Sequence, residues 1–195
     1  MATRLVLASA SPRRAELLRQ LGVSFDVVPS ELPEARPPGS AREAVTALAL
    51  AKARSVARRL GSGVVLGADT AVVLEGEIFG KPRNPEEARR MLRQLGGCQH
   101  EVMTGVALVE APAGRETVAA VVTRVLMRAY AEAEIDAYVA SGEPFDKAGA
   151  YAIQGAGGAL VAAVEGCYTN VVGLPLTTTR RLLEEWGIIA SRGAS

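Results

Sequence analysis

The sequence has a single histidine, His100, and only two cysteines, Cys98 and Cys167, among its 195 residues. The two cysteines do not have the spacing of metal-binding thiolates, so we expect two free thiols in a reducing compartment. A catalytic triad built on histidine would have to use His100, and no Gly-x-Ser-x-Gly motif occurs. Covalent catalysis therefore has little support, and His100 is expected on the flank of a strand.

Long hydrophobic runs and an excess of one charge are also missing. No apolar stretch approaches 18 residues, which predicts no transmembrane helix, and the first residues do not resemble a signal peptide. Lysine and arginine total 22 against 21 acidic residues, and aromatic residues make up only 4%. A general nucleic-acid binder usually has a basic excess and aromatic side chains for stacking. We therefore predict a cytoplasmic protein that binds neither membranes nor nucleic acids, although a local anion site remains open.

Lysine is scarce relative to arginine. Only Lys52, Lys81 and Lys147 occur among the 22 basic residues. A general preference for arginine would explain this background. A lysine retained against that preference indicates a place where a compact ammonium is needed, although chance explains any one of them equally well.

What the sequence does contain is an alternation of apolar strands and capped helices. Strands are predicted at 4–8, 25–28, 64–66, 71–74, 101–110, 117–128 and 159–164, and helices at 12–21, 41–60, 85–95, 132–140 and 176–186. The two longest strands form a hairpin signal that breaks a purely parallel pattern. The proline-rich stretch 29–40 should be an exposed loop. We therefore predict an α/β fold, a mixed sheet with helices around it. The length suits one domain over residues 1–195 or two small lobes.

The residues after the first strand can bind an anion. Ser9, Ser11, Arg13 and Arg14 surround the predicted start of a helix, where free backbone amides and the helix dipole attract negative charge. Arginine side chains add charge-assisted hydrogen bonds to phosphate oxygens. A capped, solvated helix start would explain the same residues equally well.

A second candidate is Asp69 in the stretch Gly67–Thr70, which we expect between two short strands. Active sites of open α/β sheets gather at strand ends. An acid at such a place is costly unless it is exposed, paired or bound to a metal. An ordinary turn aspartate is an equally good explanation from the residues alone.

The stretch 141–155 is the most unusual segment of the chain. Its polar residues include Glu143, Asp146, Lys147 and Gln154, set among glycines and a proline. Ordinary loops are shorter and less varied, which favours a functional role over a purely structural loop.

The stretch Gly76–Pro82 is not a phosphate-binding P-loop. Only three residues separate its two glycines, and proline follows Lys81. The remaining inventory is acids, lysines and arginines around glycine-rich turns. Such residues can hold a divalent cation and phosphates, which suits the attack of water on a phosphoanhydride.

Taken in chain order, these residues closely resemble the Maf family of nucleoside triphosphate pyrophosphatases. The matching stretches cover almost the whole chain: Leu7–Arg14, Lys52 in Ala-Lys-Ala-Arg, Gly67–Thr70, Gly80–Pro82, Asp146–Gly155 and Asn170–Pro175. The resemblance implies a twisted mixed sheet with flanking helices, like that of inosine triphosphate pyrophosphatases, with two lobes around a deep cleft. It also implies a homodimer and a divalent metal cofactor, Mg²⁺ or Mn²⁺.

The resemblance also implies roles for individual residues. Asp69 would be the general base or a ligand of the metal, and Glu34 would be a metal ligand. Glu31 is an alternative to Glu34 in the same loop. The residues implied to bind the nucleotide are Ser9, Arg13, Arg14, Lys52, Thr70, Lys81, Lys147 and Gln154. All three lysines fall on motif positions, which favours a functional reason for their retention.

Two branches of the family differ in substrate: one hydrolyses dTTP and UTP, the other 7-methyl-GTP. The second branch usually has tryptophan, glutamine and glutamate at the positions of Arg13, Thr70 and Gln154, so this chain resembles the first. The resemblance predicts hydrolysis of dTTP and UTP to the monophosphate and pyrophosphate by water attack on the α-phosphorus. Two alternatives stay open: a pyrophosphatase for CTP or modified purine nucleotides, and a nucleotide-binding regulator of septum formation.

Overall fold

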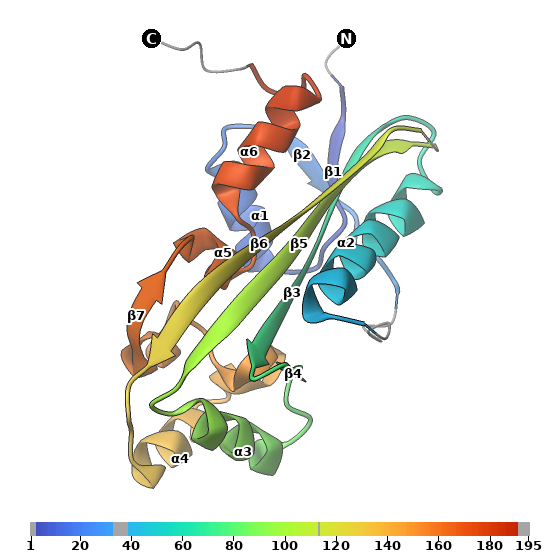
Figure 1. Ribbon diagram of the computed structural model, residues 1–195. Helices are drawn as coiled ribbons and strands as arrows, with labels where there is room; N and C mark the ends of the chain where they lie inside the picture. The colour runs from blue at the N-terminus through green and yellow to red at the C-terminus, as the bar shows by residue number, and fades with distance from the viewer. Residues whose placement is uncertain (1–2, 33–38, 113, 191–195) are drawn as a thin grey trace, which may run out of the picture. The chain divides into compact units, whose positions relative to one another are not determined.

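The computed structural model describes residues 3–32, 39–112 and 114–190 (Figure 1). Within these residues the strands are β1 (Leu5–Leu7), β2 (Phe25–Val27), β3 (Gly63–Leu74), β4 (Glu77–Phe79), β5 (Gln99–Ala111), β6 (Glu116–Met127) and β7 (Val161–Glu165). The helices are α1 (Pro12–Arg19), α2 (Ala41–Ala57), α3 (Pro85–Leu95), α4 (Glu132–Ala140), α5 (Tyr168–Val172) and α6 (Leu176–Glu185). The 3₁₀-helices η1 (Glu143–Asp146), η2 (Ala148–Ala150) and η3 (Ala156–Leu160) lie between α4 and β7. No helix in this part of the chain is long and apolar enough to cross a membrane.

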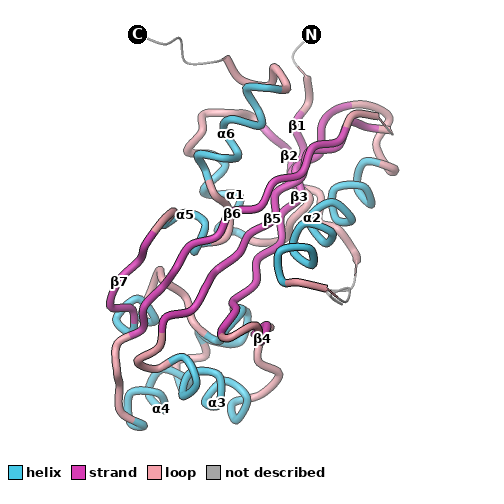
Figure 2. Tube along the Cα trace, viewed as in Figure 1, coloured by secondary structure: helices cyan, strands magenta, loops and turns pink. Residues whose placement is uncertain are grey.

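The described strands form one mixed sheet in the order β2-β1-β3-β5-β6-β7, with β4 paired to β3 (Figure 2). β1 runs parallel to β2 and to β3, whereas β4 is antiparallel to β3 and β7 is antiparallel to β6. Parallel neighbours need a crossover connection, and α1 and α2 provide it here. The predicted α/β fold with a mixed sheet is confirmed, and the cleft implied by the resemblance stays a prediction.

The chain divides into two compact units. Unit 1 comprises Met1–Asp69, Thr104–Val121 and Gly173–Ser195, and unit 2 comprises Thr70–Met103 and Val122–Val172. Each unit has a hydrophobic core of its own, and the strands β3, β5 and β6 each contribute residues to both units. The prediction of one functional domain over residues 1–195 therefore stays a prediction.

Helix α2 of unit 1 begins at the capping box that the sequence predicts. Ser40 Oγ accepts a hydrogen bond from the Glu43 amide, and the Glu43 carboxylate accepts one from the Ser40 amide at 2.8 Å. This reciprocal pair satisfies amides that have no partner within the helix. It fixes where α2 starts and therefore which of its side chains face the sheet.

The contact of α2 with the sheet is unusually close. A Cβ atom at Gly67 of β3 would lie 2.2 Å from the backbone oxygen of Ala49, and one at Gly105 of β5 would lie 2.3 Å from that of Val45. Real side chains do not approach a backbone oxygen so closely, so both strands need glycine where the helix crosses them. The backbone of α2 therefore rests directly on β3 and β5.

In unit 2, helices α3 and α4 lie side by side (Figures 1 and 2). The ion pairs Arg89–Asp136 and Arg93–Glu132, each at 2.7 Å, link the two helices on their solvent side. Exposed pairs of this kind contribute only about 0–1 kcal/mol each. Most of the stabilisation therefore comes from the buried apolar residues beneath, which include Met91, Leu92, Leu95, Ile135 and Val139.

The only histidine of the chain is buried in the core of unit 2. His100 lies on β5, as predicted, and its Nε2 is 2.8 Å from Tyr151 Oη, with the two rings edge to face. Burial lowers the pKa of His100 to about 4. The ring is therefore neutral at physiological pH and belongs to the core.

One prediction about the strands is wrong. The sequence predicts two strands, 64–66 and 71–74, on either side of Gly67–Thr70, but β3 runs through all of them without a break. The reason is that Gly67 serves a helix contact here and does not form a turn. The elements β4 and α5 and the 3₁₀-helices were not predicted.

Gly67→Ala should destabilise the protein, because the new methyl group would meet the α2 backbone, which cannot move aside as a side chain can. Overpacking of this kind costs about 1–3 kcal/mol, and we expect a loss of at least about 2 kcal/mol in urea unfolding. Gly61→Ala is the matched control, since a Cβ there meets nothing within 4 Å and should change stability by less than about 0.5 kcal/mol. Equal stability of the two variants would contradict the close contact.

The buried histidine should make stability depend on pH. Between about pH 6.5 and pH 4 the unfolded chain takes up a proton at His100 that the folded chain excludes. Folding should therefore weaken as the pH falls through this range, by up to about 1.4 kcal/mol per pH unit. His100→Gln removes the titrating group, so urea unfolding at pH 7 and pH 5 should show a smaller loss than wild type. An identical loss in both proteins would refute this account.

Candidate active site

The predicted site residues fall into two groups, one in each unit. Unit 1 contains Ser9, Arg13, Arg14, Lys52 and Asp69, and unit 2 contains Thr70, Lys81, Lys147 and Gln154. The predicted metal ligand Glu34 lies outside the described residues. Its alternative, Glu31, is exposed and lies 3.3 Å from Arg59 in an ion pair.

The centre of the unit 1 group is a buried ion pair between Lys52 and Asp69. Lys52 Nζ donates to Asp69 Oδ1 at 2.7 Å, and each side chain is only 8% exposed. Asp69 is two residues beyond Gly67 and therefore on the same face of β3, the face on which α2 lies. The glycine contact thus brings the lysine of α2 to the aspartate of β3.

The second carboxylate oxygen of Asp69 is open. Oδ2 is buried, and among the described residues no hydrogen-bond donor reaches it. A buried acceptor without a donor costs free energy and is rare in native proteins. Because Lys52 holds Oδ1, Oδ2 is the atom that can accept a proton from water or contact a cation.

The turn between β1 and α1 is held together by Ser9 and Arg14. Ser9 Oγ accepts from the Ser11 amide at 3.2 Å and from Arg14 Nη1 at 3.3 Å, and Arg14 Nε donates to the backbone oxygen of Gly173 at 2.8 Å. Ser11 occupies the N-cap position, although its side chain makes no capping hydrogen bond. Arg13 is half-buried in the first turn of α1. The Arg14 guanidinium therefore stands at the N-terminus of α1, and Arg13 lies in the first turn of this helix, in agreement with the anion-site hypothesis.

In unit 2, the segments that contain the two remaining lysines lie side by side. The amide of Gly149 donates to the backbone oxygen of Gly80 at 3.0 Å, which joins the stretch of Lys147 to that of Lys81. Lys147 Nζ contacts the Asp146 carboxylate and lies 3.4 Å from the backbone oxygen of Glu143. The structure therefore brings together two parts of the chain that are more than sixty residues apart.

The other two residues of the unit 2 group are Thr70 and Gln154. Thr70 is half-buried on β3, and Gln154 is exposed between η2 and η3. Glu143 lies in the stretch 141–155 that the sequence marks as unusual, but no role was predicted for it. Its carboxylate accepts hydrogen bonds from the amides of Ala156 and Gly157, both at 3.1 Å. The sequence signal that could have identified this role is an acidic residue followed by a glycine-rich stretch. Backbone amides in such a stretch need a hydrogen-bond acceptor, and the acid can provide it.

The chemistry of Asp69 fits a divalent cation. No group of three or more His, Cys, Asp or Glu side chains gathers within residues 3–32, 39–112 and 114–190. Magnesium is commonly held by one or two carboxylates, with waters and substrate phosphates completing its shell. The open Oδ2 of Asp69 has the chemistry of one such ligand, and the predicted second ligand, Glu34, lies outside the described residues.

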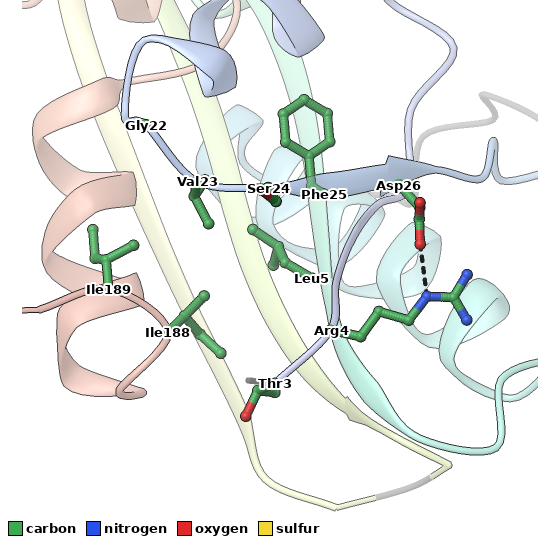
Figure 3. Close-up of a pocket in the computed structure, with 10 residues that line it drawn as sticks. All are labelled: Thr3, Arg4, Leu5, Gly22, Val23, Ser24, Phe25, Asp26, Ile188 and Ile189. Carbon is green, nitrogen blue, oxygen red and sulfur yellow. Dashed lines mark hydrogen bonds and ion pairs between the residues drawn. The ribbon is translucent and has the colours of Figure 1, made fainter. Parts of the chain in front are cut away.

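A cavity of about 450 Å³ in unit 1 does not coincide with these groups (Figure 3). It is lined by Thr3, Arg4, Leu5, Gly22, Val23, Ser24, Phe25, Asp26, Ile188 and Ile189. These residues lie at the amino end of β1, whereas the phosphate-binding candidates follow its carboxyl end. Figure 3 shows the ion pair of Arg4 and Asp26, 2.7 Å long, at its wall. The cavity contains none of the predicted site residues.

Comparison with known proteins assigns the family. A model of the family described as Maf-like protein matches residues 4–186. The chain belongs to this family. A dTTP/UTP pyrophosphatase of Moorella thermoacetica is 54% identical to this family member over 189 residues, covering 95% of this chain and 96% of the relative. A dTTP/UTP pyrophosphatase of Anaeromyxobacter dehalogenans is 55% identical over 189 residues, covering 96% of each. The family resemblance seen in the sequence is confirmed.

Solved structures of other proteins show a weaker likeness. The Ham1 protein of Staphylococcus aureus has 15% identity and a TM-score of 0.47, covering 64% of this chain and 71% of its own. A nucleoside-triphosphatase, dITP/XTP pyrophosphatase, of Mycobacterium abscessus has 20% identity and a TM-score of 0.44, covering 64% and 74%. These values are too low to support a conclusion about this family member.

Substitutions at Lys52 and Asp69 should have coupled effects on the free energy of unfolding. Lys52→Met alone leaves the Asp69 charge buried and unpaired, which should cost about 3 kcal/mol. The double variant Lys52→Met/Asp69→Leu removes both charges and should recover at least about 1 kcal/mol relative to the sum of the single losses. The exposed pair Arg4–Asp26 is the control, and the same cycle there should give less than about 1 kcal/mol. Additive losses at Lys52 and Asp69 in urea unfolding would contradict a buried pair.

Proposed function

We propose that the chain hydrolyses dTTP and UTP to the nucleoside monophosphate and pyrophosphate. The observation that carries the proposal is the buried Lys52–Asp69 pair, which leaves one oxygen of Asp69 open. Relatives that share 54% and 55% of the sequence over nearly the whole chain are named for this activity. The residues at the positions that distinguish the two branches, Arg13, Thr70 and Gln154, support the pyrimidine substrates.

In the proposed mechanism, Asp69 acts on the attacking water. Lys52 fixes the carboxylate through Oδ1, and Oδ2 accepts the proton as the water oxygen attacks the α-phosphorus. The bond between the α-phosphorus and its bridging oxygen breaks, and pyrophosphate leaves. Ser9, Arg13 and Arg14 of unit 1 are proposed to hold phosphate oxygens at the start of α1, where guanidinium groups and free amides offset negative charge.

The unit 2 group is proposed to serve the rest of the nucleotide. Lys81 and Lys147 are point charges suited to phosphate oxygens, and their segments are joined by the Gly149–Gly80 hydrogen bond. The amide of Gln154 offers both a donor and an acceptor, which suits the neutral edge of uracil or thymine. A carboxylate would suit the cationic ring of 7-methylguanine better, so glutamine favours the pyrimidines.

A divalent cation, a homodimer and a cytoplasmic location complete the proposal. In the alternative role of Asp69, Oδ2 would hold Mg²⁺ or Mn²⁺ instead of accepting the proton, with Glu34 as the proposed second ligand. The bound cation would supply positive charge to the phosphate oxygens. The family resemblance supports the homodimer, and light scattering of the purified protein would test it.

The bond that breaks can be identified with labelled water. In H₂¹⁸O with Mg²⁺, dTTP and UTP should yield monophosphate and pyrophosphate, and mass spectrometry should find the label in the monophosphate alone. Label in pyrophosphate would mean attack on the β-phosphorus, and nucleoside diphosphate with orthophosphate would mean a different enzyme. A panel with CTP and 7-methyl-GTP should show at least about a tenfold preference for dTTP and UTP, about 1.4 kcal/mol.

Replacing Asp69, the proposed general base, should greatly slow turnover. Asp69→Asn should lower kcat at least about 10²-fold, the smallest usual effect of a general base. Asp26→Asn is the matched control, because that exposed carboxylate pairs with Arg4 and has no proposed role in the reaction. A folded Asp69→Asn variant with the kcat of the control would exclude Asp69 from the mechanism.

A further inference from the structure

The exposed side chain of Gln154 stands in a short turn between η2 and η3. An exposed residue can discriminate between bases only if its backbone is fixed, since a misplaced amide loses directional hydrogen bonds. Neither a helix nor a strand contains Gln154. Whatever fixes this turn therefore controls where the side-chain amide can be placed.

Two side chains hold the turn on both sides of Gln154. Tyr138 Oη accepts a hydrogen bond from the amide of Ala152 at 3.1 Å, two residues before Gln154. Glu143 accepts from the amide of Ala156 at 3.1 Å, two residues after it, and from that of Gly157 at 3.1 Å. Tyr138 Oη in turn donates to Glu143 Oε1 at 2.9 Å. The hydroxyl and the carboxylate thus form one bridge that spans the turn.

Two glycines make this bridge possible. A Cβ at Gly155 would lie 2.8 Å from Glu143 Oε2, and a Cβ at Gly157 would lie 2.5 Å from Tyr138 Oη. Gly155 also has a φ of 99°, which L side chains rarely adopt. The backbone around Gln154 is therefore shaped so that the two side chains can reach it.

The protonation states give the bridge a fixed direction. Burial raises the pKa of Glu143, but the hydrogen bonds from Gly157, Tyr138 and Ala156 outweigh it and lower the pKa below its usual value. Burial raises the pKa of Tyr138, so the hydroxyl keeps its proton. The carboxylate therefore only accepts, and three donors converge on it.

We propose that Glu143 and Tyr138 are positioning residues for Gln154 and that they set the base selectivity of the enzyme through it. This inference rests on the proposed function, in which Gln154 binds the uracil or thymine edge. Neither residue needs to touch the substrate. Their effect is to hold the backbone from Ala152 to Gly157 so that the amide of Gln154 meets the base in one orientation.

Glu143→Gln tests the carboxylate, and Tyr138→Phe tests the hydroxyl while keeping the buried ring. In Glu143→Gln an amide N–H₂ replaces an acceptor and opposes the backbone donors. We expect kcat/KM for dTTP and UTP to fall about tenfold or more, mainly through KM, while that for 7-methyl-GTP changes by less than about threefold. Glu132→Gln on α4 is the matched control, because that exposed carboxylate pairs with Arg93 and should keep the wild-type ratio.

A double-mutant cycle with Gln154→Ala separates positioning from a general structural role. If Glu143 acts through Gln154, Glu143→Gln should change the selectivity ratio by less than about twofold once Gln154 is alanine. Urea unfolding of each variant shows that it is folded at the assay temperature, and Tyr138→Phe serves alone if Glu143→Gln does not fold. An equal fall in kcat/KM for every nucleotide tested would overturn the positioning role. So would additive effects of the Glu143 and Gln154 substitutions on the selectivity ratio.

The experiment also distinguishes this inference from the proposed function. A wild-type protein without preference for dTTP and UTP would overturn the proposed function and this inference together. A wild-type preference that persists in both Glu143→Gln and Tyr138→Phe would overturn the inference alone. The inference is supported if the preference for dTTP and UTP over 7-methyl-GTP falls in both variants and keeps its wild-type value in Glu132→Gln.

Discussion

The direct contact of the α2 backbone with β3 and β5 is the constraint on which the proposed chemistry depends. Because Gly67 and Gly105 have no side chains, the helix lies against the strands at backbone distance. A helix held further out by ordinary side chains would not bring a lysine to a buried aspartate in this way. The pair of Lys52 and Asp69 is thus a product of backbone packing, and the open oxygen of Asp69 follows from which oxygen the lysine holds.

The two groups of candidate residues are stabilised by different means. In unit 1, Lys52 and Asp69 lie on regular secondary structure, and their positions follow from the packing of a helix on a sheet. In unit 2, Lys147 and Gln154 lie between short 3₁₀-helices. Around Gln154, hydrogen bonds from backbone amides to single side chains replace regular structure. A regular framework around the proposed reactive group and a recognition segment fixed by side-chain hydrogen bonds agree with what the proposed hydrolysis and base choice each require.

Much of the fold was predictable because local signals agree with the tertiary structure. The capping box at Ser40, the Asn84 start of α3 and the helix over 132–140 were all confirmed. The break predicted at Gly67–Thr70 was wrong because glycine there indicates a helix contact, and a single sequence does not distinguish this from a turn. The motif residues were identified from the family resemblance, and their roles remain predictions. The Lys52–Asp69 pair and the Glu143 bridge were not predictable, since each depends on which segments fold against each other.

The order of synthesis has a consequence for when the turn between β1 and α1 can form. Unit 1 contains both the earliest and the latest described segments, whereas the last residue of unit 2 is Val172. A chain made from its amino end therefore releases all of unit 2 from the ribosome before unit 1 is complete. Arg14, present from the start, obtains its backbone partner only when Gly173 emerges. The hydrogen bonds of this turn are therefore completed only after every residue of unit 2 has been synthesised.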